Sequence, residues 1–463
     1  MHPPFTCQTP TPQPTSSTGQ FGFGYDALSR RTQLTRPNGV NTNYSYDSVS
    51  NLLSVLHQAG STTLDGASYG YDYAGNRTSK ANFLNGTTSN YGYDLIYELQ
   101  QVTQGGSTTE SYSYDAAGNR LSSLGVNPYS YNTSNELTSI PSGSYTYDAN
   151  GNTLSDPSGK QYTWNFENQL TSVTVPGSGT TTYRYDPFGS RIYKSSPTWT
   201  GAFVYDGYDL IETVNSGGTI VARYAGTRTL DETLAELRSG GSSYYEADGL
   251  GSITSLSSSA GAIANTYTYD SFGNVTNFTG TLSNPFQYTA REFDQESALD
   301  YYRTRYYDPT TGRFLSEDPL RFKTNVNFYP YALSNPIRFN DPTGLSAADI
   351  GRIGGACQKC TDQLTQSGER LEGSGWWNGE LNNAAAAIGW GNHYSGCDRQ
   401  ANLTASCLNF PSSPPGYDNS WTFTVESTHW GLHRVTVGRS NNPFDPVVIC
   451  DSWKNTFTTV PSF

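Results

Sequence analysis

A short unit that recurs from residue 21 to about residue 280 constrains this chain more than any other feature. Each copy has an aromatic residue, one further residue, the pair Tyr-Asp, a few turn-forming residues and an apolar segment. Successive copies lie about 16 to 25 residues apart, the range of solenoids and repeat arrays. Clear copies carry Tyr-Asp at residues 25–26, 46–47, 71–72, 93–94, 114–115, 147–148, 185–186 and 269–270.

The chemistry of one unit predicts a β-hairpin. Alternating Tyr-x-Tyr places both rings on one face of a strand. The aspartate ends the strand and can accept hydrogen bonds from the turn, where Gly-Asn tolerates positive φ. The apolar segment that follows is the returning strand. A lone hairpin is marginal in water, so each copy is expected to pair with its neighbours in a continuous sheet.

Composition excludes several classes of protein. Aromatic residues make up 14% of the 463-residue chain, which argues against disorder. The net charge of −13 disfavours nucleic acid as a partner of the whole chain. There is no apolar run of membrane-spanning length, and the Pro/Thr/Ser-rich residues 1–20, which we interpret as a linker, have no signal-peptide core. Export would then need dedicated secretion machinery.

The chain changes character near residue 345. Five of its six cysteines, at positions 357, 360, 397, 407 and 450, lie beyond that point, as do most of its tryptophans, while the Tyr-Asp units stop. Two bodies are therefore expected to meet there.

The repeats resemble the YD repeat of the Rhs family over residues 21–345. The resemblance implies a mainly β fold in which a strip of hairpins winds into a hollow shell. About a dozen repeats is few for a complete shell, so an open shell or part of one is also expected. A more specific signature, "LDYYRTRYYDPTTGRFLSEDPL" followed by "NDPTGL", looks like the Rhs-associated core. We therefore divide the chain into a linker (1–20), a strip (21–265), a core (266–345) and a C-terminal toxin-like domain (346–463).

The core of that family cuts its own chain after the Asp-Pro-x-Gly-Leu signature, which implies a cut between Leu345 and Ser346. Two carboxylates that share a proton can hydrolyse a peptide, one as base and the other as acid. The candidates are Asp318 and Asp341, with Arg313 as the group that holds one of them ionised or polarises the carbonyl. Where the family pattern has a glycine two residues after the first Asp-Pro pair, this chain has Arg321.

Asp-Pro is also a common turn dipeptide, so either aspartate could simply end a strand. We interpret Asp308, in "YYDP", as such a turn residue.

Residues 346–463 predict a small α+β domain, with amphipathic helices first and three strands at 421–426, 433–438 and 446–450. Cys397 falls where a helix is expected to begin, which would lower its thiol pKa. The order Cys397, His433, Asp451 is similar to that of papain-like and transglutaminase-type domains. Cys397 would be the nucleophile, His433 the proton shuttle and Asp451 the group that orients His433.

Other interpretations of this domain stay open. His429 is an alternative base, and Asn392 or His393 could help to build an oxyanion site. Cys357 and Cys360 form half of a zinc site or could enter a disulfide, and Cys407 and Cys450 are most simply core residues. A nuclease is the other common payload, although seven Lys/Arg against ten Asp/Glu after residue 345 give no basic footprint.

The resemblance, together with these candidate residues, implies a secreted or cell-surface polymorphic toxin that is delivered into a target cell and releases a cysteine hydrolase or deamidase. We expect no cofactor and no metal. The expected partners are a cognate immunity protein, secretion machinery and a protein substrate in the target cell. The alternative is a non-enzymatic surface protein that binds carbohydrate or cell-wall polymer.

Overall fold

The computed structural model describes residues 19–227, 229–320 and 327–345, together with the backbone of four strands between residues 421 and 460. The fold is mainly β, as the repeats predict, and its strands pair antiparallel with their neighbours in sequence. Within the described residues, no helix is long and apolar enough to cross a bilayer.

Residues 22–279 form one meandering strip that consists of sheets of ten, three and fourteen strands. The first sheet contains β1 (Gly22–Tyr25), β2 (Arg31–Thr35), β3 (Val40–Tyr46), β4 (Leu52–Ala59), β5 (Thr62–Tyr71), β6 (Arg77–Asn82), β7 (Thr88–Tyr93), β8 (Leu99–Gln104), β9 (Ser107–Tyr114) and β10 (Arg120–Ser123). The second contains β11 (Ser130–Tyr131), β12 (Leu137–Ile140) and β13 (Gly143–Ser144).

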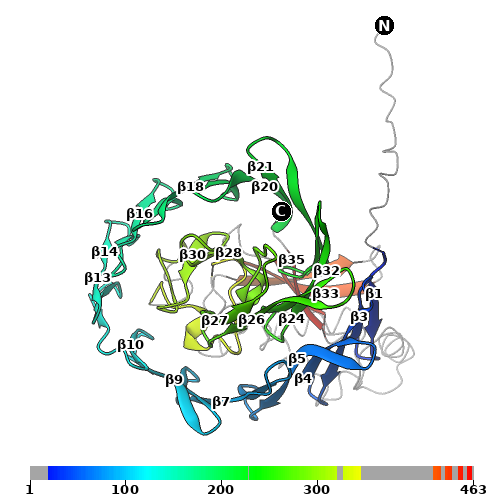
Figure 1. The fold of residues 1–463 in the computed structure, drawn as a ribbon. Helices are drawn as coiled ribbons and strands as arrows, with labels where there is room; N and C mark the ends of the chain where they lie inside the picture. The colour runs from blue at the N-terminus through cyan, green and yellow to red at the C-terminus, as the bar shows by residue number, and fades with distance from the viewer. Residues whose placement is uncertain are drawn as a thin grey trace.

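The third sheet contains β14 (Thr146–Tyr147), β15 (Thr153–Ser155), β16 (Gln161–Trp164), β17 (Leu170–Val175), β18 (Gly179–Tyr185), β19 (Arg191–Ser195), β20 (Thr200–Asp206), β21 (Asp209–Asn215), β22 (Ile220–Gly226), β23 (Thr233–Arg238), β24 (Gly241–Ala247), β25 (Ile253–Ser258), β26 (Ile263–Tyr269) and β27 (Val275–Thr279). Figure 1 shows the strip curving round as a ring from blue through cyan to green.

The aspartate of each repeat builds the turn that follows it. In the third copy, Oδ1 of Asp72 accepts hydrogen bonds from the backbone N–H groups of Ala74 (2.9 Å) and Asn76 (2.8 Å). Its Oδ2 accepts from the Asn76 side chain at 2.9 Å. The same pattern recurs at Asp115 and Asp270. One carboxylate thus satisfies the donors of the turn, which explains why the repeat needs Asp.

The tyrosine of each repeat joins it to the repeat before. The hydroxyl of Tyr114 donates to the carbonyl of Leu99 at 3.0 Å, and that of Tyr93 donates to the carbonyl of Arg77. Tyr46, Tyr71, Tyr131, Tyr147, Tyr185 and Tyr269 make equivalent bonds. In each case the acceptor is the first residue after the preceding Asp or Asn turn. A ring packs while its hydroxyl is satisfied, which suits tyrosine better than phenylalanine.

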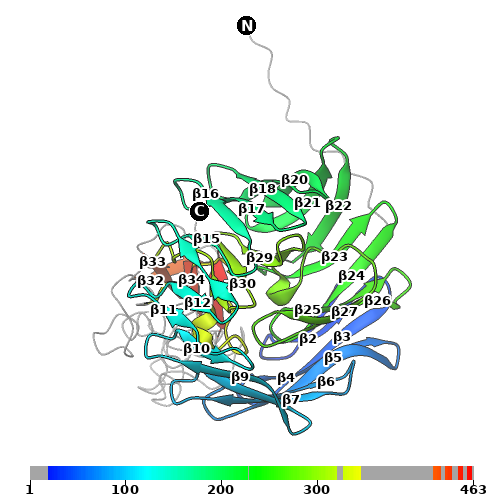
Figure 2. The same ribbon diagram turned by 60° about the vertical axis from the view of Figure 1, so that its left-hand side comes forward.

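The end of the strip overlaps its beginning, and the ring closes. Nζ of Lys80, on β6, lies 2.6 Å from Oδ2 of Asp248, which follows β24. Oδ2 of Asp65 accepts from the hydroxyl of Ser255 on β25 at 2.7 Å, and Nη2 of Arg36 donates to the carbonyl of Tyr245 at 2.7 Å. Figure 2 shows β25 and β26 beside β2, β3 and β5, and β25 is in contact with β5.

Residues 286–320 and 327–345 form a compact insert inside the ring. Their sheet contains β28 (Glu292–Asp294), β29 (Leu299–Tyr302), β30 (Arg305–Asp308) and β31 (Arg313–Phe314), and the 3-10 helices η1 (Tyr288–Ala290) and η3 (Ala332–Ser334) flank it. Buried aromatic rings fill its centre, where the Tyr307 and Tyr331 ring centroids lie 4.5 Å apart. Figure 1 shows β28 and β30 in yellow-green within the ring.

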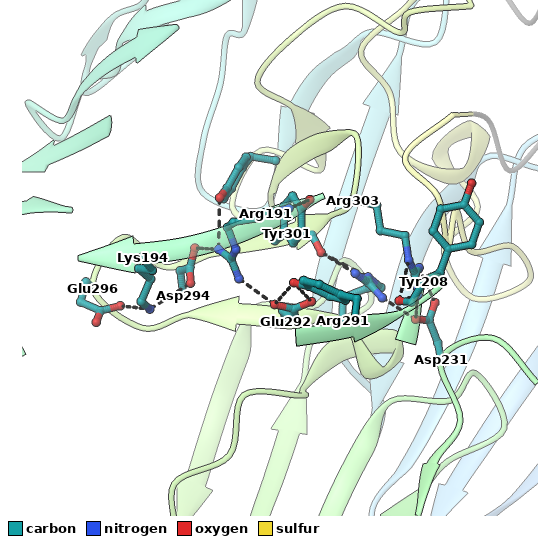
Figure 3. A network of polar contacts seen from close by, with 12 residues as sticks. Arg191, Lys194, Tyr208, Asp231, Arg291, Glu292, Asp294, Glu296, Tyr301 and Arg303 are labelled. Atoms are coloured by element: carbon teal, nitrogen blue, oxygen red, sulfur yellow. Dashed lines mark hydrogen bonds and ion pairs between the residues drawn. The ribbon is translucent and has the colours of Figure 1, made fainter. Parts of the chain in front are cut away.

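Buried ion pairs fix this insert to the strip. Arg191, on β19, bonds Asp294 at 2.5 Å and Glu292 at 2.8 Å, and Lys194 bonds Asp294 at 3.0 Å and Glu296 at 2.8 Å (Figure 3). Such pairs are retained only where geometry is good, because each ion has lost its hydration.

In the C-terminal part, the structure describes a four-stranded antiparallel sheet of β32 (Trp421–Thr428), β33 (His433–Ser440), β34 (Val447–Asp451) and β35 (Thr456–Val460). The first three are the strands that the sequence predicts, and β35 is one that it did not. The expected helices lie outside the described residues.

Candidate self-cleavage site

The site is built around the two-residue turn between β29 and β30. Tyr302 pairs with Arg305 across the hairpin, so Arg303 and Thr304 form its tip. Arg303 has a φ of 60°, a left-handed conformation that costs a non-glycine residue about 1–2 kcal/mol. Its surroundings must therefore hold it there.

Arg305 joins the two predicted aspartates. Its Nη2 lies 3.3 Å from Oδ2 of Asp318 and 3.1 Å from Oδ2 of Asp341. Its Nη1 donates to the carbonyl of Phe328 at 2.9 Å, and its guanidinium carbon lies 3.6 Å from the centroid of the Phe314 ring. Arg305 and both aspartates are buried. One cation thus holds two carboxylates, 23 residues apart in sequence, side by side.

The backbone fixes each carboxylate from the other side. Oδ1 of Asp318 accepts from the N–H of Leu320 at 2.8 Å, and the N–H of Asp318 donates to the carbonyl of Phe328 at 3.0 Å. Oδ1 of Asp341 accepts from the N–H of Leu345 at 3.1 Å. Asp341 therefore holds the residue whose carbonyl belongs to the predicted scissile bond. Ser346, on the other side of that bond, lies outside the described residues.

The loop from Asp341 to Leu345 lies against the hairpin turn. Oγ1 of Thr304 donates to the carbonyl of Thr343 at 2.7 Å, and Nε of Arg305 donates to the carbonyl of Gly344. Gly344 has a φ of 72°, and a Cβ there would lie 2.4 Å from the Tyr302 carbonyl oxygen. The close approach to the Tyr302 carbonyl and the positive φ both require glycine at this position of the loop.

A cavity of about 190 Å³ lies beside this loop. Thr343 and Leu345 line it, together with Thr304, Tyr208 and Tyr306. A water occupies about 30 Å³ in the liquid, so the cavity can hold several water molecules next to the predicted scissile residue.

The structure places Arg313 away from the aspartates. Its Nη1 donates to Oδ1 of Asn119 at 3.0 Å and its Nη2 donates to the carbonyl of Asn135, both on the strip. The guanidinium also lies 5.0 Å from the Tyr329 ring centroid. Arg313 thus fastens the insert to the ring, and Arg305 stands where the sequence led us to expect Arg313.

Arg305 was missed because sequence gives no local sign of its partners. It lies in the middle of a tyrosine-rich strand pair, "DYYRTRYYD", where a buried arginine is unexpected unless it is paired. This context marks Arg305 as a candidate for a buried ion pair but does not name its partners. Asp308 is a turn residue, as interpreted: its Oδ1 accepts from the N–H of Thr310 at 2.9 Å.

Most of the C-terminal candidates lie outside the described residues. Those outside are Cys357, Cys360, Asn392, His393, Cys397, Cys407 and His429. His433 begins β33 and Asp451 ends β34, and these strands are paired antiparallel with Thr436 opposite Cys450. The two positions therefore lie at the same end of adjacent strands. Among the described residues, no group of three or more His, Cys, Asp or Glu side chains could hold a metal ion.

Comparison with known proteins agrees with this architecture. The teneurin YD-shell family matches residues 16–341. A tRNA3(Ser)-specific nuclease WapA of Bacillus spizizenii is 31% identical over 312 residues, which are 65% of this chain and 12% of that protein. A double-stranded DNA deaminase toxin A of Burkholderia cenocepacia is 27% identical over 70% of this chain and 24% of its own length.

Among solved structures, the crystal structure of TcdB2-TccC3-Cdc42 has a TM-score of 0.60 at 22% identity and covers 71% of this chain and 19% of its own. That likeness concerns the fold. The chain thus spans between an eighth and a quarter of these curated relatives. With the family match extending over most of the strip and insert, the chain belongs to the teneurin YD-shell family.

Proposed function

We propose that this chain cleaves itself between Leu345 and Ser346 and so frees residues 346–463 as an effector from a YD-repeat shell. The observation that carries the proposal is the position of Arg305, which bonds both Asp318 and Asp341 while Asp341 bonds the N–H of Leu345. Two carboxylates, a cation and the end of the predicted scissile segment therefore meet within one buried site.

The proposed reaction is hydrolysis of one peptide bond. One carboxylate takes a proton from water, whose oxygen attacks the carbonyl carbon of Leu345. The other carboxyl group gives its proton to the nitrogen of Ser346 as the C–N bond breaks. The products are a carboxyl group on Leu345 and an amino group on Ser346. The carboxylate that took the proton from water is now the protonated member, so the pair again holds one proton.

Arg305 would favour this reaction by limiting the repulsion between two buried carboxylates. The cavity beside Thr343 and Leu345 would supply the water. Because the reaction happens once per chain, a slow rate is sufficient for release.

The test is the intact mass of the purified chain, with wild type compared with Asp318→Asn and Asp341→Asn. We expect the wild type to give two pieces that part after Leu345 and the variants to stay whole. An uncut wild type would contradict self-release and favour a binding role for the repeats instead.

We further propose that the shell is exported by dedicated secretion machinery, acts in a target cell, and is matched by an immunity protein in the producer. The class of effector has two candidates. The first is the cysteine hydrolase or deamidase of Cys397, His433 and Asp451, which acts on protein. It is supported by the position of His433 and Asp451 at one end of paired strands.

The second candidate acts on nucleic acid, and its support is the names of the relatives, which include tRNA nucleases and a double-stranded DNA deaminase. These names argue against our expectation from net charge that nucleic acid is not a partner. A released effector meets its substrate without the acidic strip, so the charge of the whole chain does not decide the matter.

The two candidate effectors can be distinguished by the effect of Cys397→Ala on toxicity and on nucleic acid. Wild type and Cys397→Ala would be produced in a sensitive cell, and its tRNA, DNA and proteins analysed. Damage to nucleic acid that persists in Cys397→Ala would favour the second candidate. Loss of toxicity in that variant, with intact nucleic acid in wild type, would favour the first.

A further inference from the structure

Three consecutive residues of the β29–β30 hairpin donate to three consecutive carbonyls of the cleavage loop. Nη1 of Arg303 donates to Pro342, Oγ1 of Thr304 donates to Thr343 at 2.7 Å, and Nε of Arg305 donates to Gly344. The backbone N–H of Thr304 also donates to Thr343, at 3.3 Å. The loop is thus held at every carbonyl between Asp341 and Leu345.

Arg303 is the member of this group that also reaches the strip. Its Nη2 lies 2.7 Å from Oδ1 of Asp231, its Nη1 lies 3.2 Å from Oδ2, and its Nη2 donates to the carbonyl of Tyr208 at 3.1 Å. Asp231 lies between β22 and β23, and Tyr208 lies between β20 and β21. Figure 3 shows the Arg303 guanidinium between these two groups.

Asp231 is itself held by a second arginine of the insert. Arg291, which precedes β28, pairs with Oδ1 of Asp231 and donates through Nη2 to the carbonyl of Tyr301 at 2.9 Å. The Asp231 side chain is 10% exposed and Arg291 is buried. One strip carboxylate therefore pairs with two arginines of the insert, and its loss would leave two poorly hydrated cations without the carboxylate that they share.

We propose that Asp231 and Arg303 are positioning residues that make self-cleavage depend on the docking of the β22–β23 segment of the strip on the insert. The inference rests on the self-cleavage proposed above. Asp231 docks only when β22 and β23 are in place, and it then fixes Arg303 in its left-handed conformation with Nη1 on the Pro342 carbonyl. Without Asp231, Arg303 relaxes, Pro342 loses its donor, and the adjoining Asp341 and Leu345 lose their fixed geometry.

Such coupling has a clear use. A chain that cut itself before the strip had docked around the insert would lose its effector outside the shell. A carboxylate supplied by the strip delays the reaction until the enclosure is built around the insert.

The first test measures the rate at which the full chain is cut, by intact mass after refolding from denaturant. Asp231→Asn should slow cleavage at least tenfold. The matched control is Glu232→Gln, the next residue, whose carboxylate pairs with Arg31 across the ring closure without touching the hairpin or the cleavage loop. This control should cleave within about twofold of wild type.

Should Asp231→Asn fail to fold, Arg303→Lys gives the same comparison. A lysine can keep the ion pair with Asp231, but its single nitrogen cannot also serve the Tyr208 and Pro342 carbonyls. We expect a slowed cut with the thermal midpoint close to that of wild type.

A second readout separates positioning from general stability. Hydrogen exchange would be measured in an uncleavable Asp318→Asn background. Adding Asp231→Asn should accelerate exchange of the Gly344 and Leu345 amides at least tenfold and leave β14 to β19 unchanged, whereas adding Glu232→Gln should not. Unchanged exchange at those two amides would overturn the inference.

The two proposals can fail separately. A wild-type chain that stays whole would overturn self-cleavage and this inference with it. A wild type that is cut, beside an Asp231→Asn variant that is cut equally fast, would overturn only the positioning role.

Discussion

Lys80 and Asp248, 168 residues apart in sequence, form an ion pair of 2.6 Å that closes the ring. The Asp248 side chain is 5% exposed, so its charge depends on this partner. Lys80→Met should therefore lower the free energy of unfolding by about 2–4 kcal/mol, because a buried carboxylate would be left without its cation. The midpoint of urea unfolding measures the change.

The control for that experiment is Arg223→Met. Arg223 pairs with Glu212 on the strip, but its side chain is 56% exposed. An exposed pair contributes about 0–1 kcal/mol, so this variant should unfold nearly as wild type does. If both variants lose the same free energy of unfolding, the Lys80–Asp248 pair stabilises the protein no more than an exposed ion pair does.

Arg305 and Arg313 offer a direct comparison of two buried arginines. Arg305→Met should slow self-cleavage by about 100-fold or more, since it removes the group that bonds both aspartates. Arg313→Met removes the hydrogen bonds to Asn119 and Asn135 and the contacts with the Tyr131 and Tyr329 rings, and should lower the thermal midpoint while cleavage persists. The rate at which the C-terminal piece appears measures cleavage in both variants. Slower cleavage in Arg313→Met than in Arg305→Met would mean that Arg313, and not Arg305, supports the reaction.

Gly344→Ala should abolish efficient cleavage. The new Cβ would lie 2.4 Å from the Tyr302 carbonyl oxygen and 2.7 Å from Oγ1 of Thr304, and would push the loop off the hairpin. Gly86→Ala is the matched control, because Gly86 has a similar φ of 70° and open space around it. Gly86→Ala should lower the free energy of unfolding by about 1–2 kcal/mol and leave cleavage unchanged. Cleavage assays and thermal midpoints on both variants make the comparison.

His57 and Glu246 should give the ring closure opposite responses to pH. Burial and then Arg36 lower the pKa of His57 from 6.5 to about 4, and burial raises the pKa of Glu246 from 4.5 to about 7. Between pH 4.5 and 6.5 the unfolded chain binds a proton at His57 that the folded chain does not. The folded chain binds one at Glu246 that the unfolded chain does not. The two effects on stability therefore nearly cancel.

Removing either group should reveal the other. Relative to wild type, Glu246→Gln should lose stability as the pH falls from 6.5 to 4.5, by about 1.4 kcal/mol per pH unit. His57→Gln should gain stability over the same range by a similar amount. Urea midpoints of the three proteins at several pH values provide the measurement, and parallel curves would contradict both shifts.

Much of the strip could be predicted from sequence because its chemistry is local. The bonds from Asp72 to Ala74 and Asn76 span four residues, and the bond from Tyr93 to Arg77 spans one repeat. Period-two patterning and turn residues encode such contacts directly. The strands at 421, 433 and 447 were predicted on the same grounds.

The rest depends on which distant surfaces meet. Sequence patterning could name Asp318 and Asp341 as candidates, but no local signal distinguishes Arg305 from Arg313 as their partner. The same holds for Lys80 with Asp248, and for Asp231 with Arg303. A chain of about a dozen repeats suggested an open shell, whereas the contacts of β2 to β6 with β24 and β25 close the ring.

The closure of the ring also restricts how such a strip can change in length. Each strand pairs with its sequence neighbour, so the circumference is fixed by counting hairpins. The closing contacts, however, join particular side chains such as Lys80 and Asp248. Gain or loss of one repeat between them would move every closing residue away from its partner by the width of one repeat. The number of repeats in this segment therefore cannot change without loss of the closing contacts. Insertions that preserve the enclosure are therefore expected at the hairpin tips, where a turn can lengthen without changing the number of strands.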